Sequence, residues 1–170
     1  RGNRVLIVST SGGGATLAAD EAGGRGLALP KLPAGLIEEL RQLDLPGNAN
    51  LSNPLDVPSL DASLFERAIT LADKYDVADL VLVSFGDPVP GSVDMLPRIA
   101  DKIHAGLAVA YFGGGEAERA SRVPLHRAGI PVYRTPERAV RAIASTVWRA
   151  QYRRNGGGKM LNRGRSQDAT

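Results

Sequence analysis

Three consecutive glycines are the first residues in this chain whose type and spacing could do chemistry. The segment Ser11–Gly14 separates a strand-like run, Arg4–Thr10, from a helix-like run that begins near Ala15. Glycine lets a backbone turn sharply and puts no side chain between the backbone N–H groups and a ligand. The following helix would direct its free N–H groups and positive dipole end to the same place, which suits a phosphate or a carboxylate. The segment, with Ser11, Gly12, Gly13 and Gly14, is therefore a candidate anion site; a tight turn that needs positive φ angles is the alternative.

The glycine spacing argues against two common nucleotide sites. A Walker-type loop places a lysine directly after its last glycine, and this chain has Ala15 there. The dinucleotide pattern G-x-G-x-x-G is also absent, and the second expected strand, Gly26–Pro30, ends without an acidic residue that could bind a ribose. We therefore expect an anion site rather than a dinucleotide site.

Two later loops carry further groups that could contact a ligand. Each follows a run of residues typical of a buried strand, and the second loop is another triple-glycine run. A close-packed turn is the alternative interpretation of the second loop. The candidate contacts in these loops are Gly86, Asp87, Pro88, Val89, Gly113 and Gly114.

A long polar segment, Leu45–Pro58, contains the run Ser52–Asp56. Asn and Asp side chains bond to their own backbone and Pro fixes φ, so this run could be simple turn chemistry. A connection of this length is longer than two elements need, which favours a functional loop. Asn53 and Asp56 are its candidate residues.

Strand-like and helix-like runs alternate along the chain, which predicts an α/β fold. We expect a flavodoxin-like or Rossmann-like three-layer sandwich with a mostly parallel, five-stranded sheet. Ligands bind at the carboxyl ends of the strands in such sheets, so the three glycine-containing loops should meet at one edge. The expected strands span residues 4–10, 26–30, 79–85, 107–112 and 130–133, and the expected helices 15–22, 34–43, 61–75, 92–104, 116–128 and 135 onward.

Composition and charge narrow the class of protein. The 170 residues are 43% hydrophobic and include no cysteine and no apolar run long enough for a membrane span, so we expect a cytoplasmic protein. The net charge of +3 comes from the last part of the chain. We expect one domain at residues 1–154 and a Gly-rich, basic linker at 155–170, with no contact to nucleic acid or membrane. Because the chain begins with Arg1, we also expect it to be a piece of a longer protein.

No catalytic group is evident in the sequence. His104 and His126 have no carboxylate or metal partner at a suggestive spacing, so both are expected to be structural or solvated. No Ser-His-Asp set and no metal cluster can be assembled.

Three segments together resemble NDP-forming acyl-CoA synthetases. Val8–Asp20 is similar to their TNSGGxGxLAAD segment, Ser52–Asp56 to their SNPxD loop, and Ala128–Ile143 to their aGIPvyrtperAvra ending. The segments stand in the family's order. The pattern also resembles the C-terminal, flavodoxin-like domain of the succinyl-CoA synthetase β subunit.

The resemblance implies a role as one domain of a ligase that joins an acid to CoA with ATP or GTP. The family's reaction passes through an acyl phosphate and a phosphohistidine, whose motif would lie upstream of this chain. It implies that CoA, ATP or GTP, and Mg are bound by the full-length enzyme through CoA-binding and ATP-grasp domains. This domain would help to enclose the acid and the phosphate, would be inactive alone, and could form a homo-oligomer.

The family's site residues can be carried onto this chain position by position. Thr10 stands where the family has an Asn that contacts the acid, and Ser11–Gly13 match the loop before the phosphate-directed helix. Asp87, Pro88 and Val89 stand at substrate-contacting positions. Thr10 replaces an amide by a hydroxyl, while Asp87 adds a carboxylate and Pro88 removes an N–H donor.

These departures leave two alternatives open. The chain could be a degenerate, non-catalytic regulatory or binding domain, as in some protein acetyltransferases. It could also be a self-contained binder of a flavin or nucleotide.

Overall fold

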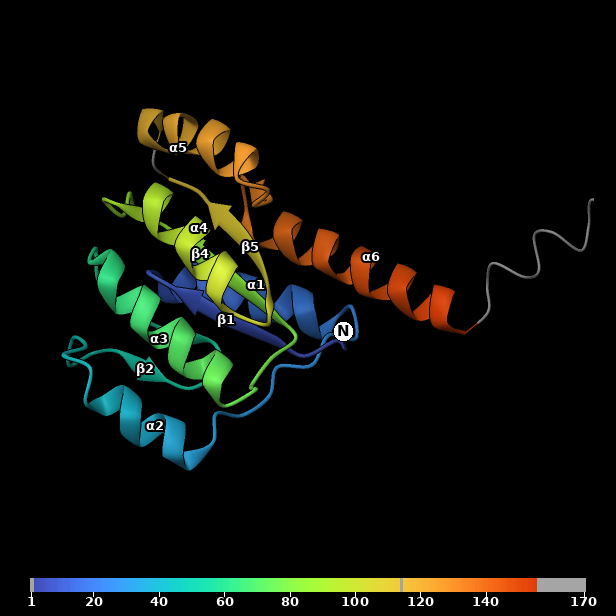
Figure 1. Ribbon diagram of the computed structural model, residues 1–170, viewed down its shortest axis with the longest axis horizontal. Coiled ribbons are helices and arrows are strands. Elements are labelled where there is room, and N and C mark those ends of the chain that lie inside the picture. The colour runs from blue at the N-terminus through green and yellow to red at the C-terminus, as the bar shows by residue number, and fades with distance from the viewer. Residues whose placement is uncertain (1, 114, 156–170) are drawn as a thin grey trace, which may run out of the picture.

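A single sheet runs through the middle of the molecule, with helices on both faces (Figure 1). The computed structural model describes residues 2–113 and 115–155. The strands are β1 (Val5–Ser9), β2 (Asn50–Leu51), β3 (Leu55–Asp56), β4 (Leu80–Phe85), β5 (Gly106–Tyr111) and β6 (Val132–Tyr133). The helices are α1 (Gly12–Gly23), α2 (Ala34–Arg41), α3 (Ala62–Lys74), α4 (Ser92–Lys102), α5 (Glu116–Arg127) and α6 (Pro136–Arg154).

The strand order is that of a flavodoxin-like sheet. The six strands lie in the order β2-β3-β1-β4-β5-β6, and only β2 is antiparallel to its neighbour within the described chain. Numbered by their own sequence, the parallel strands follow the order 2-1-3-4-5. The expected fold class is therefore confirmed. The order reverses between β1 and β4, and ligands in such folds bind beyond the carboxyl ends of the strands at this point.

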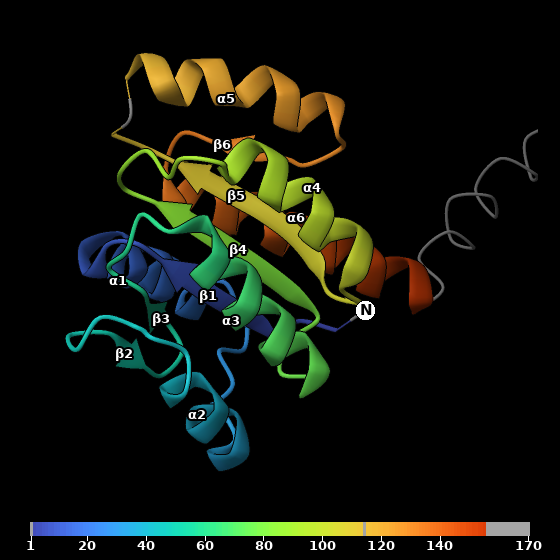
Figure 2. The same cartoon turned by 60° about the vertical axis from the view of Figure 1, so that its left-hand side comes forward.

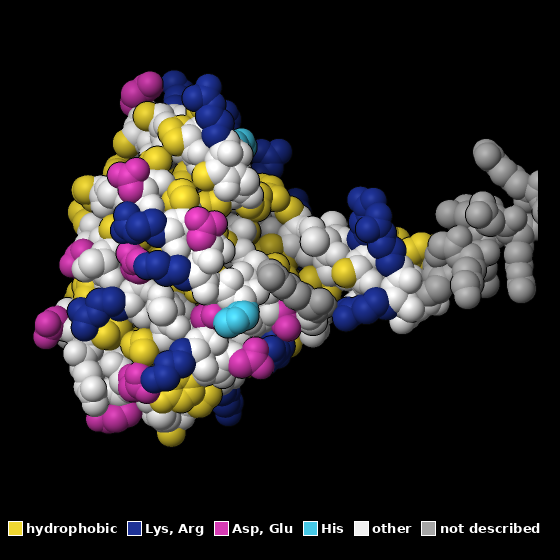
Figure 3. Space-filling model, viewed as in Figure 1, with side chains coloured by type: hydrophobic (Ala, Val, Ile, Leu, Met, Phe, Trp, Pro, Cys, Tyr) yellow, Lys and Arg dark blue, Asp and Glu magenta, His cyan; other side chains and the backbone are white. Residues whose placement is uncertain are grey.

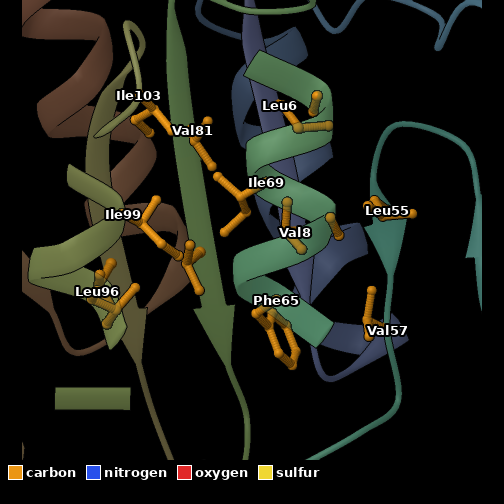
Figure 4. Close-up of a cluster of buried hydrophobic side chains, with 14 of the residues drawn as sticks. Leu6, Val8, Leu55, Val57, Phe65, Ile69, Val81, Leu96, Ile99 and Ile103 are labelled. Atoms are coloured by element: carbon orange, nitrogen blue, oxygen red, sulfur yellow. The ribbon is translucent and has the colours of Figure 1, made fainter. Parts of the chain in front are cut away.

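Alternating side chains of the central strands build a core on each face of the sheet. Leu6 and Val8 of β1 belong to the cluster that packs against α2, α3, α4 and α5 (Figure 4). Val5 and Ile7 belong to the cluster beneath α1 and α6. Figure 2 shows these two layers on opposite sides of the sheet. Because both faces are covered, β1 is buried at every residue, as parallel strands in three-layer folds are.

The expected second strand was misplaced. Residues 26–30 form only one isolated bridge, between Ala28 and Arg4. The neighbour of β1 is instead β3, which lies inside the segment expected to be a polar loop. A strand of two residues beside Asn53 and Pro54 carries no periodic pattern, so its pairing depends on the tertiary contact with β1 rather than on local sequence.

The start of the first helix also differs from the expectation. Helix α1 begins at Gly12 rather than near Ala15, so the glycines form its first turn. Helix α6 ends at Arg154, the last residue of the expected domain, and extends away from the sheet with arginine side chains along it (Figure 3). Of the expected linker at 155–170, only Asn155 lies within the described residues. No helix in the described ranges is long and apolar enough to cross a membrane.

Candidate functional site

The first turn of α1 presents unpaired backbone donors. Ser11 is the N-cap: its extended backbone precedes the helix, and its Oγ accepts from the Gly14 N–H at an N···O distance of 3.4 Å. The Ala15 N–H donates to the Ser11 carbonyl at 2.9 Å. The N–H groups of Gly12 and Gly13 have no intrahelical acceptor, because they belong to the first turn. Both glycines are exposed. The structure thus places two free donors at the positive end of a 12-residue helix.

The three expected loops meet at this helix end. The Gly86 N–H, just after β4, donates to Thr10 Oγ1 at 2.9 Å. The ring of Phe112, just after β5, lies so close to Gly14 that a Cβ there would stand 2.5 Å from its Cζ. Gly113 adopts a φ of 83°, and a Cβ there would stand 2.5 Å from the Gly86 carbonyl oxygen. A side chain at position 113 would meet backbone at a positive φ, so glycine is required there, whereas a side chain at position 14 would force the Phe112 ring to move.

Thr10 joins these loops through hydrogen bonds, and its side-chain oxygen already accepts one from Gly86. It is buried, its N–H donates to the Ser84 carbonyl at 3.1 Å, and its Oγ1 accepts from Gly86. These bonds join the segments that follow β1 and β4. The geometry gives Thr10 a positioning role at the place where the resemblance implied an acid contact.

Asp56 faces the same helix end from β3. It pairs with Ser9 across the sheet, and its Oδ2 lies 3.4 Å from the point where a Cβ on Gly12 would stand. Its Oδ1 is buried and has no hydrogen-bond partner among the described residues. Burial raises the pKa of the Asp56 carboxyl group above its ordinary value. A carboxyl group with an unmatched oxygen thus stands beside the free donors.

Ser84 is a polar residue at this edge that the sequence analysis missed. It is fully buried at the end of β4, its Oγ has no partner within the described part of the chain, and it lies 3.3 Å from a Cβ built on Gly14. The sequence signal is weak: a serine at the carboxyl end of an otherwise apolar strand. Buried hydroxyl groups usually have a partner, so an unmatched one beside free N–H groups marks a polar site.

Asn53, by contrast, does not belong to the site. Its Nδ2 donates to the Val5 carbonyl at 2.8 Å and to the Pro30 carbonyl at 3.2 Å, and its Oδ1 accepts from the Ile7 N–H at 3.1 Å. The side-chain amide thereby continues the ladder along β1, away from its carboxyl end. The expectation that Asn53 contacts a ligand is not supported by this placement.

The remaining residues that were expected to contact a ligand differ in their exposure to solvent. Asp87 and Pro88 are exposed in the loop between β4 and α4. The side chain of Val89 is buried in the core cluster, so it supports the loop and does not face solvent. Gly114 lies outside the described residues.

His104 does have a carboxylate partner, Asp73, which its spacing in the sequence did not suggest. The His104 Nδ1 lies 3.0 Å from the Asp73 Oδ2, and the His126 Nε2 lies 3.3 Å from the Val132 backbone N. Both contacts are local links between elements. Within residues 2–113 and 115–155, no group of three or more His, Cys, Asp or Glu side chains could hold a metal ion.

Taken together, this edge combines backbone donors that favour negative charge with one carboxyl group of raised pKa, that of Asp56. Two backbone donors and a helix dipole attract negative charge. The Asp56 carboxyl group donates to an anion when it is protonated and repels it when it is ionised.

Comparison with known sequences gives distant relatives of one kind. No family model matches the sequence. The chain is 32% identical over 162 residues to the alpha subunit of ADP-forming acetate–CoA ligase II of Pyrococcus furiosus, an alignment that covers 89% of this chain and 35% of the relative. It is 30% identical over 145 residues to ADP-forming acetate–CoA ligase I of Archaeoglobus fulgidus, with 85% of this chain and 21% of the relative covered. The chain thus spans about a third or less of the length of these relatives.

Solved structures show the same fold. A crystal structure of a Pyrococcus horikoshii protein superposes with a TM-score of 0.80 at 28% identity, covering 89% of this chain and 36% of that one. The acetyl-coenzyme A synthetase 1 of Candidatus Korarchaeum cryptofilum, crystallised with phosphate and ADP, superposes with a TM-score of 0.74 at 22% identity, covering 88% and 35%. At this identity the second likeness concerns the fold alone.

Proposed function

We propose that this chain, a distant homologue of ADP-forming acetate–CoA ligases over most of its length, is the anion-holding domain of an NDP-forming acyl-CoA synthetase. The complete enzyme would convert an acid, CoA and ATP or GTP into an acyl-CoA, the nucleoside diphosphate and phosphate. This domain would hold the transferring phosphoryl group or the acyl phosphate. The CoA-binding domain, the ATP-grasp domain with its nucleotide and Mg, and the phosphohistidine would come from other parts of the parent protein.

One observation carries the proposal. The free N–H groups of Gly12 and Gly13 stand at the helix end where the strand order reverses, in a chain whose relatives are ligases. Loops from β1, β4 and β5 are packed against one another around this point, which fixes the donors before any ligand arrives. Donors fixed in advance stabilise charge without reorganising during the reaction.

Phosphoryl transfer suits such a site because its transition state spreads charge over the phosphoryl oxygens. Positioning and electrostatic stabilisation supply most of the catalysis. The chain's own contribution would be the two N–H donors, the dipole of α1 and the carboxyl group of Asp56. Because burial raises the pKa of Asp56, its protonated form persists to a higher pH than an ordinary Asp, and it can then donate to an anion oxygen.

A test replaces Gly13 by aspartate in the full-length enzyme. A Cβ at Gly13 meets only the Ser11 Oγ, at 3.8 Å, so Gly13→Asp should fold normally while its carboxylate occupies the anion position. We expect turnover to fall to background, with the thermal unfolding midpoint little changed. Gly23→Asp, which adds the same charge at the other end of α1 where a Cβ meets nothing within 4 Å, is the matched control and should keep most of the activity. Unchanged turnover in Gly13→Asp would rule the proposal out.

A non-catalytic regulatory domain is the second candidate. It is favoured by Thr10, whose hydroxyl oxygen is bonded to Gly86 at the position where the resemblance implied an acid contact. A parent protein that carries an acetyltransferase domain and shows no acyl-CoA formation would support it. A parent with an ATP-grasp domain and measurable synthesis of acyl-CoA would exclude it.

A further inference from the structure

Four arginines from three elements line one groove on the far side of the sheet's carboxyl edge. Arg122 comes from α5, Arg134 directly follows β6, and Arg138 and Arg141 come from the first turns of α6. Val132 and Tyr133 complete the lining, and the volume is about 480 Å³. We call this the arginine groove. It lies at the end of β6, two strands away from β4, so it is separate from the anion site at α1.

The groove holds more positive charge than its neighbours neutralise. Arg122 pairs with Glu118 along α5, and the Arg141 Nε lies 3.0 Å from the Glu21 Oε1. Arg134 and Arg138 form no ion pair with any described residue. The Nε of Arg122 is also buried without an acceptor in the described part of the chain. Glu137, in the same first turn of α6 as Arg138, adds a negative charge that helps to raise the pKa of Arg141. The groove therefore presents two guanidinium groups that have no ion pair with a described residue.

Two features of the chain oppose the clustering of positive charge in the groove. The first 148 residues hold 15 Lys and Arg against 17 Asp and Glu, and both signs are interspersed over the face shown in Figure 3. Arg138 also lies in the first turn of a 19-residue helix, where the positive dipole end disfavours a cation. An anion in the groove would relieve both the mutual repulsion of the arginines and the conflict with the helix end.

The chemistry of the groove selects phosphate groups. A guanidinium fork matches two oxygens of a phosphate, and several forks around one cavity match a ligand with more than one negative charge. A volume of about 480 Å³ is of the size that holds a small organic molecule. A nucleic acid would call for a basic stripe along a surface rather than one concave cluster.

We propose that the arginine groove binds the phosphate groups of a small organic phosphate, of the kind that nucleotides and CoA both carry. This goes beyond the anion site at α1, because it gives the domain a second binding site with different chemistry: guanidinium groups in place of backbone donors.

Calorimetry on the 170-residue chain tests this, with ADP, CoA, dephospho-CoA and inorganic phosphate as separate probes. We expect saturable binding of ADP or CoA that weakens as salt is raised. Stronger binding of CoA than of dephospho-CoA would assign the 3′-phosphate as the recognised group, and equal binding of ADP would assign the diphosphate. No saturable binding of ADP or CoA at about 1 mM would overturn the proposal, as would tighter binding of a short RNA.

Paired variants locate the binding. Arg134→Ala with Arg138→Ala removes two exposed side chains that have no ion pair with described residues, so the fold should persist. We expect the affinity to fall about tenfold or more. Lys31→Ala with Arg67→Ala removes the same charge from exposed positions elsewhere and should leave the affinity within about twofold. An equal loss in both double variants would contradict a local site.

The same titration separates this inference from the proposed function. Gly13→Asp blocks only the anion site at α1, so it should leave binding in the arginine groove intact. Loss of ADP or CoA binding in Gly13→Asp, with normal binding in the Arg134→Ala and Arg138→Ala double variant, would place the ligand at α1 and overturn the groove.

Discussion

The two edges of the sheet differ in whether their polar groups have partners within the chain. At the amino edge, Asp79 precedes β4 and accepts from three donors of Arg4: the backbone N at 3.0 Å, Nε at 3.1 Å and Nη2 at 3.3 Å. Asp76 pairs with the same arginine at 3.1 Å. The Arg4 guanidinium is the main reason that the pKa of Asp79 falls to about 2.

At the carboxyl edge the matching groups are missing. Among the described residues, one oxygen of Asp56 and the hydroxyl group of Ser84 have no partner, and the first two glycines of α1 have no intrahelical acceptor for their N–H groups. Burial also raises the pKa of Asp56. The same two strands, β1 and β4, join both edges. The amino edge thus pairs its charged groups within the chain, whereas the carboxyl edge leaves polar groups without partners among the described residues, as the proposed anion site requires.

The largest expected effect comes from Gly113→Ala, which tests whether backbone packing holds the carboxyl edge. An L-residue at a φ of 83° is strained, and its Cβ would stand 2.5 Å from the Gly86 carbonyl oxygen. We expect the free energy of unfolding in urea to fall by about 2–4 kcal/mol. Gly47→Ala, where a Cβ meets nothing within 4 Å, is the control and should change it little. Equal effects in the two variants would show that the loops are not tightly packed.

A smaller loss is expected from Asp79→Asn, which tests the closed amino edge. Because the folded pKa is about 2 and the ordinary value is 3.8, the ionised Asp79 stabilises the folded state above pH 3.8. Its contribution is lost as the pH falls through about 2. Since the Asp79 side chain is 16% exposed, we expect Asp79→Asn to lower the free energy of unfolding by about 1–2 kcal/mol at pH 7. The loss should shrink toward zero in urea unfolding at pH 2, and a loss that is independent of pH would refute the ion pair. Asp44→Asn, at an exposed position, is the control.

The smallest effect separates two buried serines on neighbouring strands. The Ser9 Oγ accepts from the Ser11 N–H at 3.1 Å and lies within bonding distance of two carbonyl oxygens, whereas the Ser84 Oγ has no partner among the described residues. Ser9→Ala should therefore lower the free energy of unfolding by about 1 kcal/mol, and Ser84→Ala should change it by less than about 0.5 kcal/mol. A larger loss in Ser84→Ala than in Ser9→Ala would mean that Ser84 has a structural partner.

The sequence predicts the fold class and the meeting of the loops, because both follow from periodic apolar runs and from the geometry of parallel sheets. It does not predict β3, because a pair of residues beside Asn53 is recognisable as a strand only through its pairing with β1. The same holds for Asn53 itself. Its amide has the composition of a turn, and its bonds to Val5 and Ile7 exist only in the folded chain.

The site was predicted in part for a similar reason. The triple-glycine run after a strand-like segment points to Gly12 and Gly13, although the helix begins at Gly12 and not near Ala15 as expected. Ser84 was not predicted as a site residue, because one hydroxyl group in an apolar strand is recognisable only once Gly14 packs beside it. The arginine groove could not be predicted, because Arg122 of α5 meets the three arginines of the segment Ala128–Ile143 only in the folded chain.

The central claim is that the carboxyl edge is left open for an anion, and a phosphate titration followed by NMR tests it most directly. Phosphate should shift the amide signals of Gly12 and Gly13 in a saturable way, and its charge should raise the pKa of Asp56 further, while Asp79 still titrates at about 2. If the Gly12 and Gly13 amides do not respond, or if Asp56 and Asp79 respond alike, the open edge is not an anion site and the account fails.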